Sequence, residues 1–543
     1  MSQSNPDLPP ADDPEPVEDR PEVGTRFDPL VIVAAGLLAL ATFLWRQLQW
    51  TGSLLGFPLD DSYIHLQFAR RLAAGEGLSF RDTEGLVAGS TSPLWTALLA
   101  IGFVLSPLFG SLALGMVASK LLGGALFVWA GLEVRRLTAL LGARRWLATL
   151  AGVACVTTDT LVFSALSGME VPLFVALTVR GVRSFVLEQN RVGGGVNAAS
   201  LLVAPSTWLL ALACLARPEG LVLLGLAVAS RTAHILRSGA GQRAAVASGV
   251  RAALLVVLVL GPVAALFWAW HGSPLPTTFG VKAGGEHRLW PAARDVWRFA
   301  EVLFRVQPWL TVLAMAGTLR LVRERRTLLP ALWVLALPLA YSAMASPGQP
   351  VLLGNFGRYA FPLLPFVIVL GCLALDELVR ELTRSSSLEL VRRWTPVVLV
   401  VVALVPGLRA TWIGAQRAGV AAMNVAQTDV AAAQWIGANL PTARVGAQDI
   451  GALGLFSDNE LVDLVGLVNP EILDFTRGPG GADGLARYLT HRGVDHLLLF
   501  PASYGGEPAV QRRWPEANEV RRWRTAPNVA MAADELVLYR LAR

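Results

Sequence analysis

Residues 60–80, DDSYIHLQFARRLAAGEGLSF, come shortly after an apolar stretch at residues 29–45, PLVIVAAGLLALATFLW. That stretch is long enough to serve as a membrane span, since about 17–25 residues cross a hydrocarbon core of ~30 Å. Asp60 and Asp61 therefore stand at the mouth of a span, where each carboxylate resists losing water and repels the other. Such a pair predicts a membrane protein with a cationic partner or a catalytic step beside its first span.

The composition of the whole chain indicates a polytopic membrane protein. Of its 543 residues, 54% are hydrophobic and 16% charged, whereas soluble domains carry about a quarter charged residues. The net charge of +6 does not indicate nucleic-acid binding, because nearly all of it is arginine between apolar runs, where it orients helices. The three cysteines lie in apolar stretches and predict neither disulfides nor a metal site.

Five arginine-rich segments order the expected spans, at residues 135–145, 180–191, 231–251, 320–326 and 380–393. If all five are cytoplasmic, two spans separate each neighbouring pair, and about eleven spans result. A proline-bounded segment at 93–109 is then expected to be a juxtamembrane or re-entrant helix. The expected spans are 29–45, 112–134, 147–165, 171–187, 200–215, 220–232, 252–270, 308–322, 328–345, 359–376 and 395–411.

The chain divides into three expected regions. Residues 1–28 are proline-rich and acidic and predict a disordered cytoplasmic tail. Residues 29–412 form the transmembrane domain, with a first external loop at 46–111, and residues 413–543 form an extracytoplasmic domain. In that domain we expect helices from Asp429 and Gly484 and strands from Ala443, Glu460, Asp495 and Glu535. This alternation predicts a small α/β fold with a mostly parallel sheet.

The unusual polar residues gather on the external side of this topology. They are Asp60, Asp61, Tyr63 and His65 in the first loop, Glu170, Arg217 and Glu219 in the next two turns, Thr277, Thr278 and Lys282 in a fourth segment, Asn355, Arg358 and Tyr359 in a fifth, and Lys120 near the outer end of a span. A carboxylate can accept the proton of an attacking hydroxyl, and Lys or Arg can hold a phosphate as it leaves. The set suits a sugar carried on a lipid phosphate better than a nucleotide sugar, for which no Gly-rich phosphate loop is present.

Each of these residues also has a structural explanation. The alternatives are helix capping for Asp60–Asp61 and for Glu219, headgroup anchoring for Arg217, snorkelling for Lys120 and a plain loop role for Lys282. His65 follows Asp61 by one helical turn, so a divalent cation at the Asp60–Asp61 pair is conceivable. The histidines show no ligand spacing, however, and neither a metal cluster nor another cofactor is predicted.

In their order along the chain, the motifs resemble those of the GT-C superfamily of polyprenyl-phosphate-sugar-dependent glycosyltransferases. They are similar in particular to the AftB-type terminal arabinofuranosyltransferases of mycobacterial cell walls and their bacterial relatives. The motifs that carry the resemblance are DDSYIHLQFARRLAAGEGLSF, STSPLWTALL, SGMEVPLF, LARPEGLVL, LPTTFGVKAG, GRYAFPLLP and DIGALGLFSDNELVDLVGLVNP.

The resemblance implies a GT-C fold, a polyprenyl-phosphate sugar donor such as an arabinofuranosyl lipid, and a glycan, lipid or protein acceptor at the outer face of a bacterial cytoplasmic membrane. It implies that Asp60 or Asp61 is the catalytic base and that Lys282 and Arg358 contact the donor phosphate. It also places Glu170, Arg217 and Glu219 in the cavity. Lys120 stands where many members have Arg and is expected as a further phosphate-binding residue, while Asn355 departs from an acidic residue in relatives. We favour Asp60 as the base, because Asp61 is better placed to cap a helix from Ser62.

Two other classes of function remain open from the sequence. A transporter or flippase of lipid-linked sugars would tend to show repeats and broken helices at the midplane, and no repeat is evident here. A scaffold whose external domain recruits envelope enzymes would have little use for carboxylates that face Lys and Arg.

Overall fold

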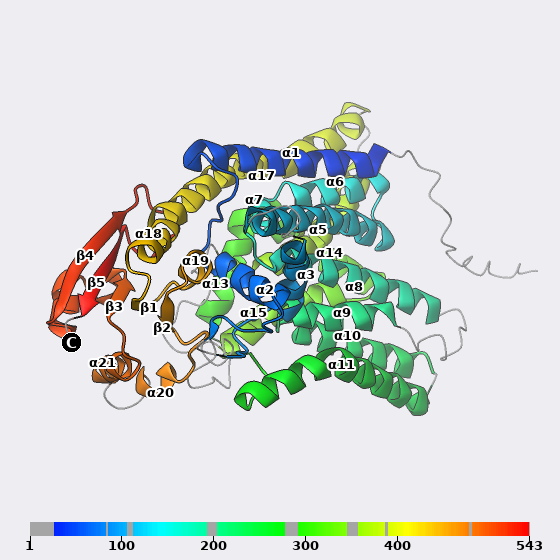
Figure 1. Cartoon of the computed structure of the whole chain (residues 1–543). Coiled ribbons are helices and arrows are strands. Elements are labelled where there is room, and N and C mark those ends of the chain that lie inside the picture. Colours follow the sequence, from blue (N-terminus) through cyan, green and yellow to red (C-terminus); the bar gives the residue numbers. More distant parts are fainter. Residues whose placement is uncertain are drawn as a thin grey trace, which may run out of the picture.

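The computed structural model describes residues 27–82, 85–105, 112–192, 204–239, 241–276, 292–344, 357–385, 389–476 and 481–541. Thr277, Thr278, Lys282 and Asn355 lie outside these ranges, as does nearly all of the predicted N-terminal tail. The N-terminal part of the chain forms a bundle of helices. The C-terminal part forms a small sheet domain, orange to red in Figure 1, which adjoins one end of the bundle.

The bundle consists mainly of apolar helices. They are α1 (Phe27–Thr51), α2 (Asp61–Ala73), α3 (Pro93–Val104), α5 (Leu112–Leu140), α6 (Arg145–Val156), α7 (Asp159–Leu166), α8 (Val171–Val192), α9 (Pro205–Ala216), α10 (Gly220–Arg237), α11 (Gly241–His271), α13 (Ala293–Val306), α14 (Pro308–Arg323), α15 (Leu329–Met344), the short η4 (Phe361–Leu363), α16 (Leu364–Ser385) and α17 (Glu389–Val425).

By length and composition, five of the described helices could each cross a membrane. The number of possible spans rises to seven if each of two bent helix pairs counts as one span. The bent pairs are α6–α7, with an angle of 54°, and α13–α14, with an angle of 116°. Seven of the eleven expected spans coincide with these helices or bent pairs, and the spans 200–215 and 328–345 coincide with the shorter apolar helices α9 and α15. The expected spans 171–187 and 395–411 lie on α8 and α17, which are not among the described helices that meet this test. Helix α3, in the segment 93–109, has twelve residues and is about 18 Å long, which is less than a hydrocarbon core of ~30 Å; α9 has the same length.

Small residues let neighbouring helices approach closely. A Cβ atom on Gly317 of α14 would overlap the backbone oxygen of Leu370 in α16. One on Gly123 of α5 would overlap the backbone oxygen of Ala165 in α7. Such backbone-to-backbone contacts are typical of membrane helices, whose association depends on close packing.

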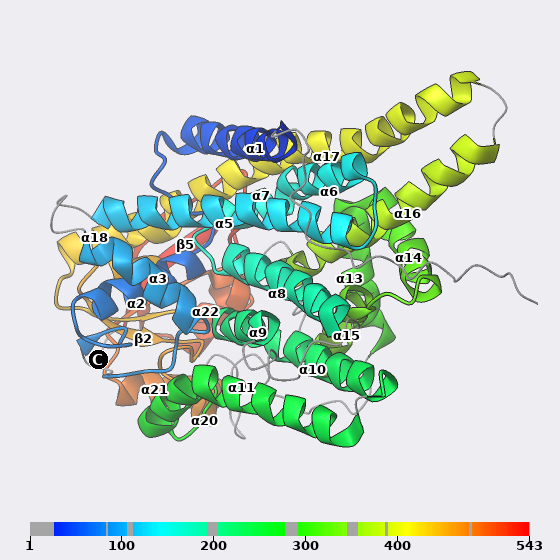
Figure 2. The same ribbon diagram turned by 90° about the vertical axis from the view of Figure 1, so that its right-hand side faces the viewer.

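Helix α1 lies along α17 in both views of the molecule (Figures 1 and 2).

Buried acids join the five arginine-rich segments at one end of the bundle. The ion pairs are those of Asp376 with Arg144, Arg320 and Arg380, of Glu133 with Arg136, Arg180 and Arg183, and of Glu188 with Arg231. The side chain of Asp376 is 0% exposed. Because each arginine-rich segment contributes at least one residue, all five lie on the same side, as the predicted topology requires.

Helix α17 continues without a break past residue 412, the predicted domain boundary. It leads through a π-helical turn, η5 (Ala426–Val430), into the sheet domain (Figure 1). That domain comprises α18 (Ala431–Asn439), β1 (Arg444–Ala447), α19 (Gly451–Phe456), β2 (Glu460–Asp463), α20 (Ile472–Thr476), α21 (Gly481–His491), β3 (His496–Leu499), η6 (Pro501–Tyr504), α22 (Glu507–Arg513), β4 (Ala517–Arg524) and β5 (Glu535–Leu541).

The sheet has the strand order β2-β1-β3-β5-β4. Strand β1 pairs in parallel with β2 and β3, whereas β5 pairs antiparallel with β3 and β4. The four predicted strands are all present, but the expectation of a mostly parallel sheet is wrong, because the chain returns as an antiparallel β4–β5 pair. Strand β4 is not predicted from the sequence, because its arginines and glutamate hide the alternation of a half-buried strand.

Candidate active site

The first-loop helix α2 carries Asp61 and His65, which lie one turn apart on the same side of the helix. Asp61 Oδ2 accepts a hydrogen bond of 2.7 Å from Nη2 of Arg358. The Asp61 side chain is 38% exposed and that of Arg358 only 6% exposed. An accessible carboxylate therefore stands in front of a buried guanidinium contributed by a residue almost three hundred positions later in the chain.

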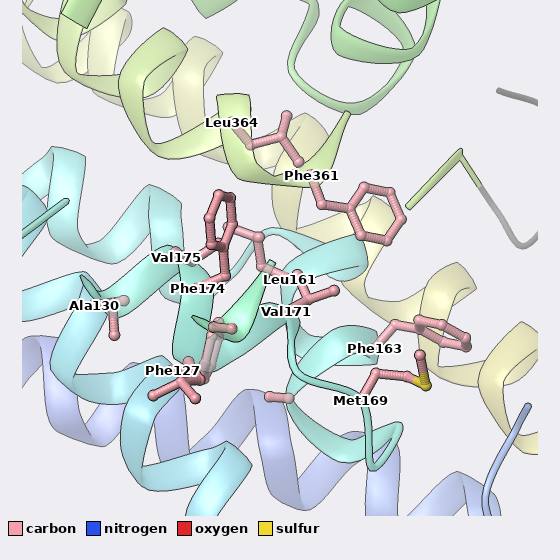
Figure 3. Close-up of a cluster of buried hydrophobic side chains, with 14 of the residues drawn as sticks. Phe127, Ala130, Leu161, Phe163, Met169, Val171, Phe174, Val175, Phe361 and Leu364 are labelled. Carbon is pink, nitrogen blue, oxygen red and sulfur yellow. The ribbon is translucent and has the colours of Figure 1, made fainter. Parts of the chain in front are cut away.

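Glu170 lies in the turn between α7 and α8, close to this pair. Its Oε1 accepts a hydrogen bond of 2.9 Å from Arg217 Nη1, and its Oε2 lies 3.3 Å from His65 Nε2. The residues on either side of Glu170 are fixed in an apolar cluster: Figure 3 shows Met169 and Val171 within the same cluster as Phe361. Packing of the turn therefore holds the Glu170 carboxylate toward α2.

Arg217 occupies the link between α9 and α10. Its Nη2 donates a hydrogen bond of 2.9 Å to Glu219. The ring of Tyr359 lies near both arginines, with its centroid 5.4 Å from the Arg217 guanidinium carbon and 5.6 Å from that of Arg358. Cation–π contacts of this kind hold the two guanidiniums on one aromatic platform. Four segments far apart in the sequence thus meet in one charged network.

The network keeps its charges although it is buried. Burial alone would raise the pKa of Glu170, but the hydrogen bond with His65 and the charge of Arg217 outweigh it and hold that pKa well below the usual value. Burial alone would lower the pKa of Arg358, and the charge of Asp61 outweighs it, so the pKa is raised. Glu170 and Arg358 therefore both stay ionised at neutral pH.

Asp60 has a different role from its neighbour. Its Oδ2 accepts a hydrogen bond of 2.6 Å from the backbone N–H of Gly451, and its Oδ1 one of 2.7 Å from that of Ala452. These N–H groups begin α19, so Asp60 caps a helix of the C-terminal domain. Burial raises the pKa of Asp60 to about 6, although the two hydrogen bonds lower it.

This arrangement contradicts the expectation that Asp61 caps a helix from Ser62. Helix α2 begins at Asp61 itself, and no side chain caps it. The two oxygens of Asp60 are already occupied by backbone donors, whereas Asp61 is the accessible carboxylate. Local capping rules could not foresee this, because the N-terminus that Asp60 caps lies about 390 residues further along the chain.

Several structural alternatives for the other residues do not match their positions. Arg217 is buried in ion pairs and does not anchor at a surface. Glu219 makes no capping hydrogen bond to α10 and pairs with Arg217. Lys120 is buried and donates a hydrogen bond of 2.7 Å to Gln47 Oε1, so it does not snorkel. Within the described ranges Lys120 makes no ion pair, and it stands apart from the charged network.

Tyr63 supports the loop rather than the charged network. Its hydroxyl accepts a hydrogen bond of 3.2 Å from the backbone N–H of Phe57. Its ring packs edge-on against Phe57 and Phe456, with centroids 5.4 Å apart in both cases. Since Phe456 ends α19, Tyr63 forms part of the contact between the first loop and the C-terminal domain.

Two acids that the sequence analysis did not place in the site lie next to the Asp pair. Asp449 follows β1; burial and then the charges of Asp60 and Asp61 raise its pKa to about 8. Asp429 lies on η5, and burial and then the charges of Asp449 and Asp60 raise its pKa. No role for Asp449 is predicted from the sequence. The available signal was its position directly after a parallel strand, where ligand sites of open α/β sheets occur.

A divalent cation does not fit the Asp60–Asp61 pair in this arrangement. Both oxygens of Asp60 face N–H donors, and Asp61 faces a guanidinium, so a cation there would meet positive partners. Across the described residues, no three or more His, Cys, Asp or Glu side chains are grouped to hold a metal ion.

Comparisons with known proteins identify the fold. Residues 415–539 match the model of a domain of unknown function (DUF8728). Curated protein sequences gave no match. Three solved structures are similar. The Archaeoglobus fulgidus oligosaccharyltransferase tethered with an acceptor peptide has a TM-score of 0.64 and 12% identity, and the match covers 96% of this chain and 74% of that chain. The archaeal oligosaccharyltransferase AglB from Archaeoglobus fulgidus in complex with an inhibitory peptide and a dolichol-phosphate has a TM-score of 0.58, 12% identity and coverages of 96% and 77%, and ArnT from Cupriavidus metallidurans bound to undecaprenyl phosphate has 0.52, 15%, 94% and 97%. The chain is thus a polytopic membrane protein with the GT-C fold and a small C-terminal α/β domain.

Proposed function

We propose that this chain is a membrane glycosyltransferase that transfers a sugar from a polyprenyl-phosphate donor to a hydroxyl of a cell-envelope acceptor. Two kinds of support meet in this proposal. The chain shares its fold with an oligosaccharyltransferase that binds a dolichol-phosphate and with ArnT bound to undecaprenyl phosphate. Its own buried network supplies a carboxylate beside arginines, which are the groups that such a transfer requires.

The observation that carries the proposal is the two-sided use of Arg358. Its Nη2 donates to Asp61, whereas its buried Nη1 has no hydrogen-bond partner among the described residues. A buried donor without a partner is costly, and a phosphate oxygen would satisfy it with a charge-assisted bond. Arg358 would then hold the donor phosphate and the proposed base, Asp61, at a fixed separation.

The proposed reaction balances without any further reagent. The acceptor oxygen attacks the anomeric carbon of the donor sugar, and the bond from that carbon to the phosphate oxygen breaks. Asp61 takes the acceptor's hydroxyl proton, and polyprenyl phosphate leaves with the electron pair. Arg358 stabilises the charge that grows on the phosphate, and Lys282, which lies outside the described residues, is proposed as a second phosphate contact.

The remaining buried groups position these two. Glu170 holds Arg217 and His65, and Tyr359 underlies both arginines, so the guanidinium of Arg358 has little freedom to turn away. From the resemblance of the motifs, we propose a pentose such as arabinofuranose as the sugar. We also propose that the site and the C-terminal domain face outward from a bacterial cytoplasmic membrane.

The test is transfer by the purified chain in proteoliposomes. A panel of polyprenyl-phosphate pentoses and hexoses would be offered with envelope glycan fragments, and released polyprenyl phosphate and glycosylated product would be counted together. We expect one donor to give both products in equal amounts. Movement of intact donor across the bilayer without release of polyprenyl phosphate would contradict this function and would favour a flippase.

A further inference from the structure

The C-terminal domain is fixed to the first loop at both ends of one short helix. Asp60 caps the start of α19, as described above. Near the end of α19, Arg81 Nη2 donates a hydrogen bond of 3.0 Å to the backbone oxygen of Leu453, and Arg70 Nη1 donates one of 3.3 Å to that of Leu455. These contacts bring the loop between β1 and α19, residues 448–450, beside the Asp60–Asp61 pair.

That loop lies where an open parallel sheet places its ligands. Strand β1 has β2 on one side and β3 on the other, and both pairings are parallel. The chain leaves β1 toward β2 through α19, whereas β3 on the other side is reached only later. This reversal makes the carboxyl end of β1 a topological switch point, the usual position of a ligand crevice. Gln448 and Asp449 are the first polar residues there.

Acceptor atoms without donors gather at this point. The buried Oε1 of Gln448 and the buried Oδ2 of Asp429 have no hydrogen-bond partner among the described residues. Asp429 is 4% exposed and lies on a π-helical turn, a distortion that is frequent at functional sites. Asp449 is partly exposed and makes no hydrogen bond to any described residue. A ligand that satisfies these oxygens must bring several donors.

The chemistry of the proposed reaction limits which substrate this is. The incoming hydroxyl and the leaving phosphate lie on opposite sides of the anomeric carbon in a direct displacement. Arg358 binds one side of Asp61, and Asp449 lies within the electrostatic reach of Asp60 and Asp61 from the C-terminal domain. Asp449 therefore lies close enough to the proposed base to contact an acceptor that is held there.

We propose that Asp449, with Gln448 and Asp429, forms a subsite for the hydroxyls of a carbohydrate acceptor. Neighbouring hydroxyls of a sugar ring can supply a donor to each of three unpartnered oxygens, whereas a single lipid or peptide hydroxyl satisfies one of them. This inference rests on the proposed glycosyl transfer and chooses a glycan among its acceptor classes. Asp449 would contact substrate without taking its proton.

The experiment compares Asp449→Ala with Asp458→Asn, a control that removes a 99% exposed acid from the same domain. Transfer to an arabinofuranosyl hexasaccharide and to a serine peptide would be measured with the full chain. Loss of the hydrogen bond to Asp449 leaves a hydroxyl of the bound acceptor without a partner, so KM for the hexasaccharide should rise about 10-fold to 100-fold in Asp449→Ala. We expect kcat, KM for the donor and slow transfer to water to change less than about two-fold, as in the control.

An unchanged KM for the hexasaccharide in Asp449→Ala would overturn the subsite. An equal loss of kcat and of transfer to water in that variant would also overturn it, because Asp449 would then be the base. A second measurement is the binding of the hexasaccharide to the full chain in the absence of donor, detected by saturation-transfer NMR. It should weaken in Asp449→Ala and not in Asp458→Asn. If the unaltered chain transfers from no donor, the proposed function fails, while this binding measurement still decides the subsite.

Discussion

Exchanging each member of the Asp60–Asp61 pair for asparagine separates a docking role from a chemical one. In Asp60→Asn, one oxygen remains to accept a backbone N–H, and an amide NH₂ faces the other donor. The loss of one charge-assisted hydrogen bond is expected to cost about 1.5–3 kcal/mol of stability. In Asp61→Asn, the new side-chain oxygen can still accept from Arg358, so stability should change little, but the base is absent.

The assay measures both quantities on the same preparations. Asp60→Asn should lower the apparent unfolding temperature by roughly 3–10 °C and keep kcat within about ten-fold at low temperature. Asp61→Asn should leave the unfolding temperature unchanged and lower kcat by about 10² to 10⁴. The exposed acid Asp458, changed to asparagine, serves as the control for both. An Asp60→Asn variant that is inactive but fully stable, beside an active Asp61→Asn, would refute these roles.

Arg358→Lys should keep the charge but lower kcat at least about 100-fold in steady-state kinetics. One lysine ammonium cannot replace the planar guanidinium, which would donate hydrogen bonds to Asp61 and to the donor phosphate together. Glu170→Gln should destabilise by about 3 kcal/mol in thermal unfolding and weaken donor binding, since it leaves Arg217 partly unpaired. The pKa of Asp449 is raised from 3.8 to about 8, so the folded state binds more protons and stability should fall as pH rises through that range. Asp449→Asn should therefore unfold at a higher temperature than the unaltered chain at pH 8 and at a similar temperature near pH 4.

The large-scale architecture could be predicted because its determinants are local or periodic. Apolar runs mark the helices, and the arginine-rich segments indicate a common side, which the ion pairs of Asp376 and Glu133 bring together. Strand β4 could not be predicted in this way, because its side chains are mostly charged and exposed and its place comes from pairing with β5.

The site was predictable in its residue types but not in its connections. The sequence places Asp61, Glu170, Arg217 and Arg358 on one side of the topology, and the structure brings these four together. Nothing local in the first loop indicates that Asp60 caps α19, since a cap at such sequence distance depends on how two domains dock. The same docking brings Asp449 beside the Asp60–Asp61 pair, and nothing local to the strand before Asp449 indicates this position.

The central claim is that Asp61 is the base of a sugar transfer whose leaving phosphate is held by Arg358. A single-turnover reaction in proteoliposomes tests it most directly, with the donor labelled in both the sugar and the polyprenyl phosphate. We expect that polyprenyl phosphate and glycosylated acceptor form together in the unaltered chain and in Asp458→Asn. In Asp61→Asn both should slow by about 10² or more while bound donor is retained. Equal single-turnover rates in Asp61→Asn and the unaltered chain would contradict the account.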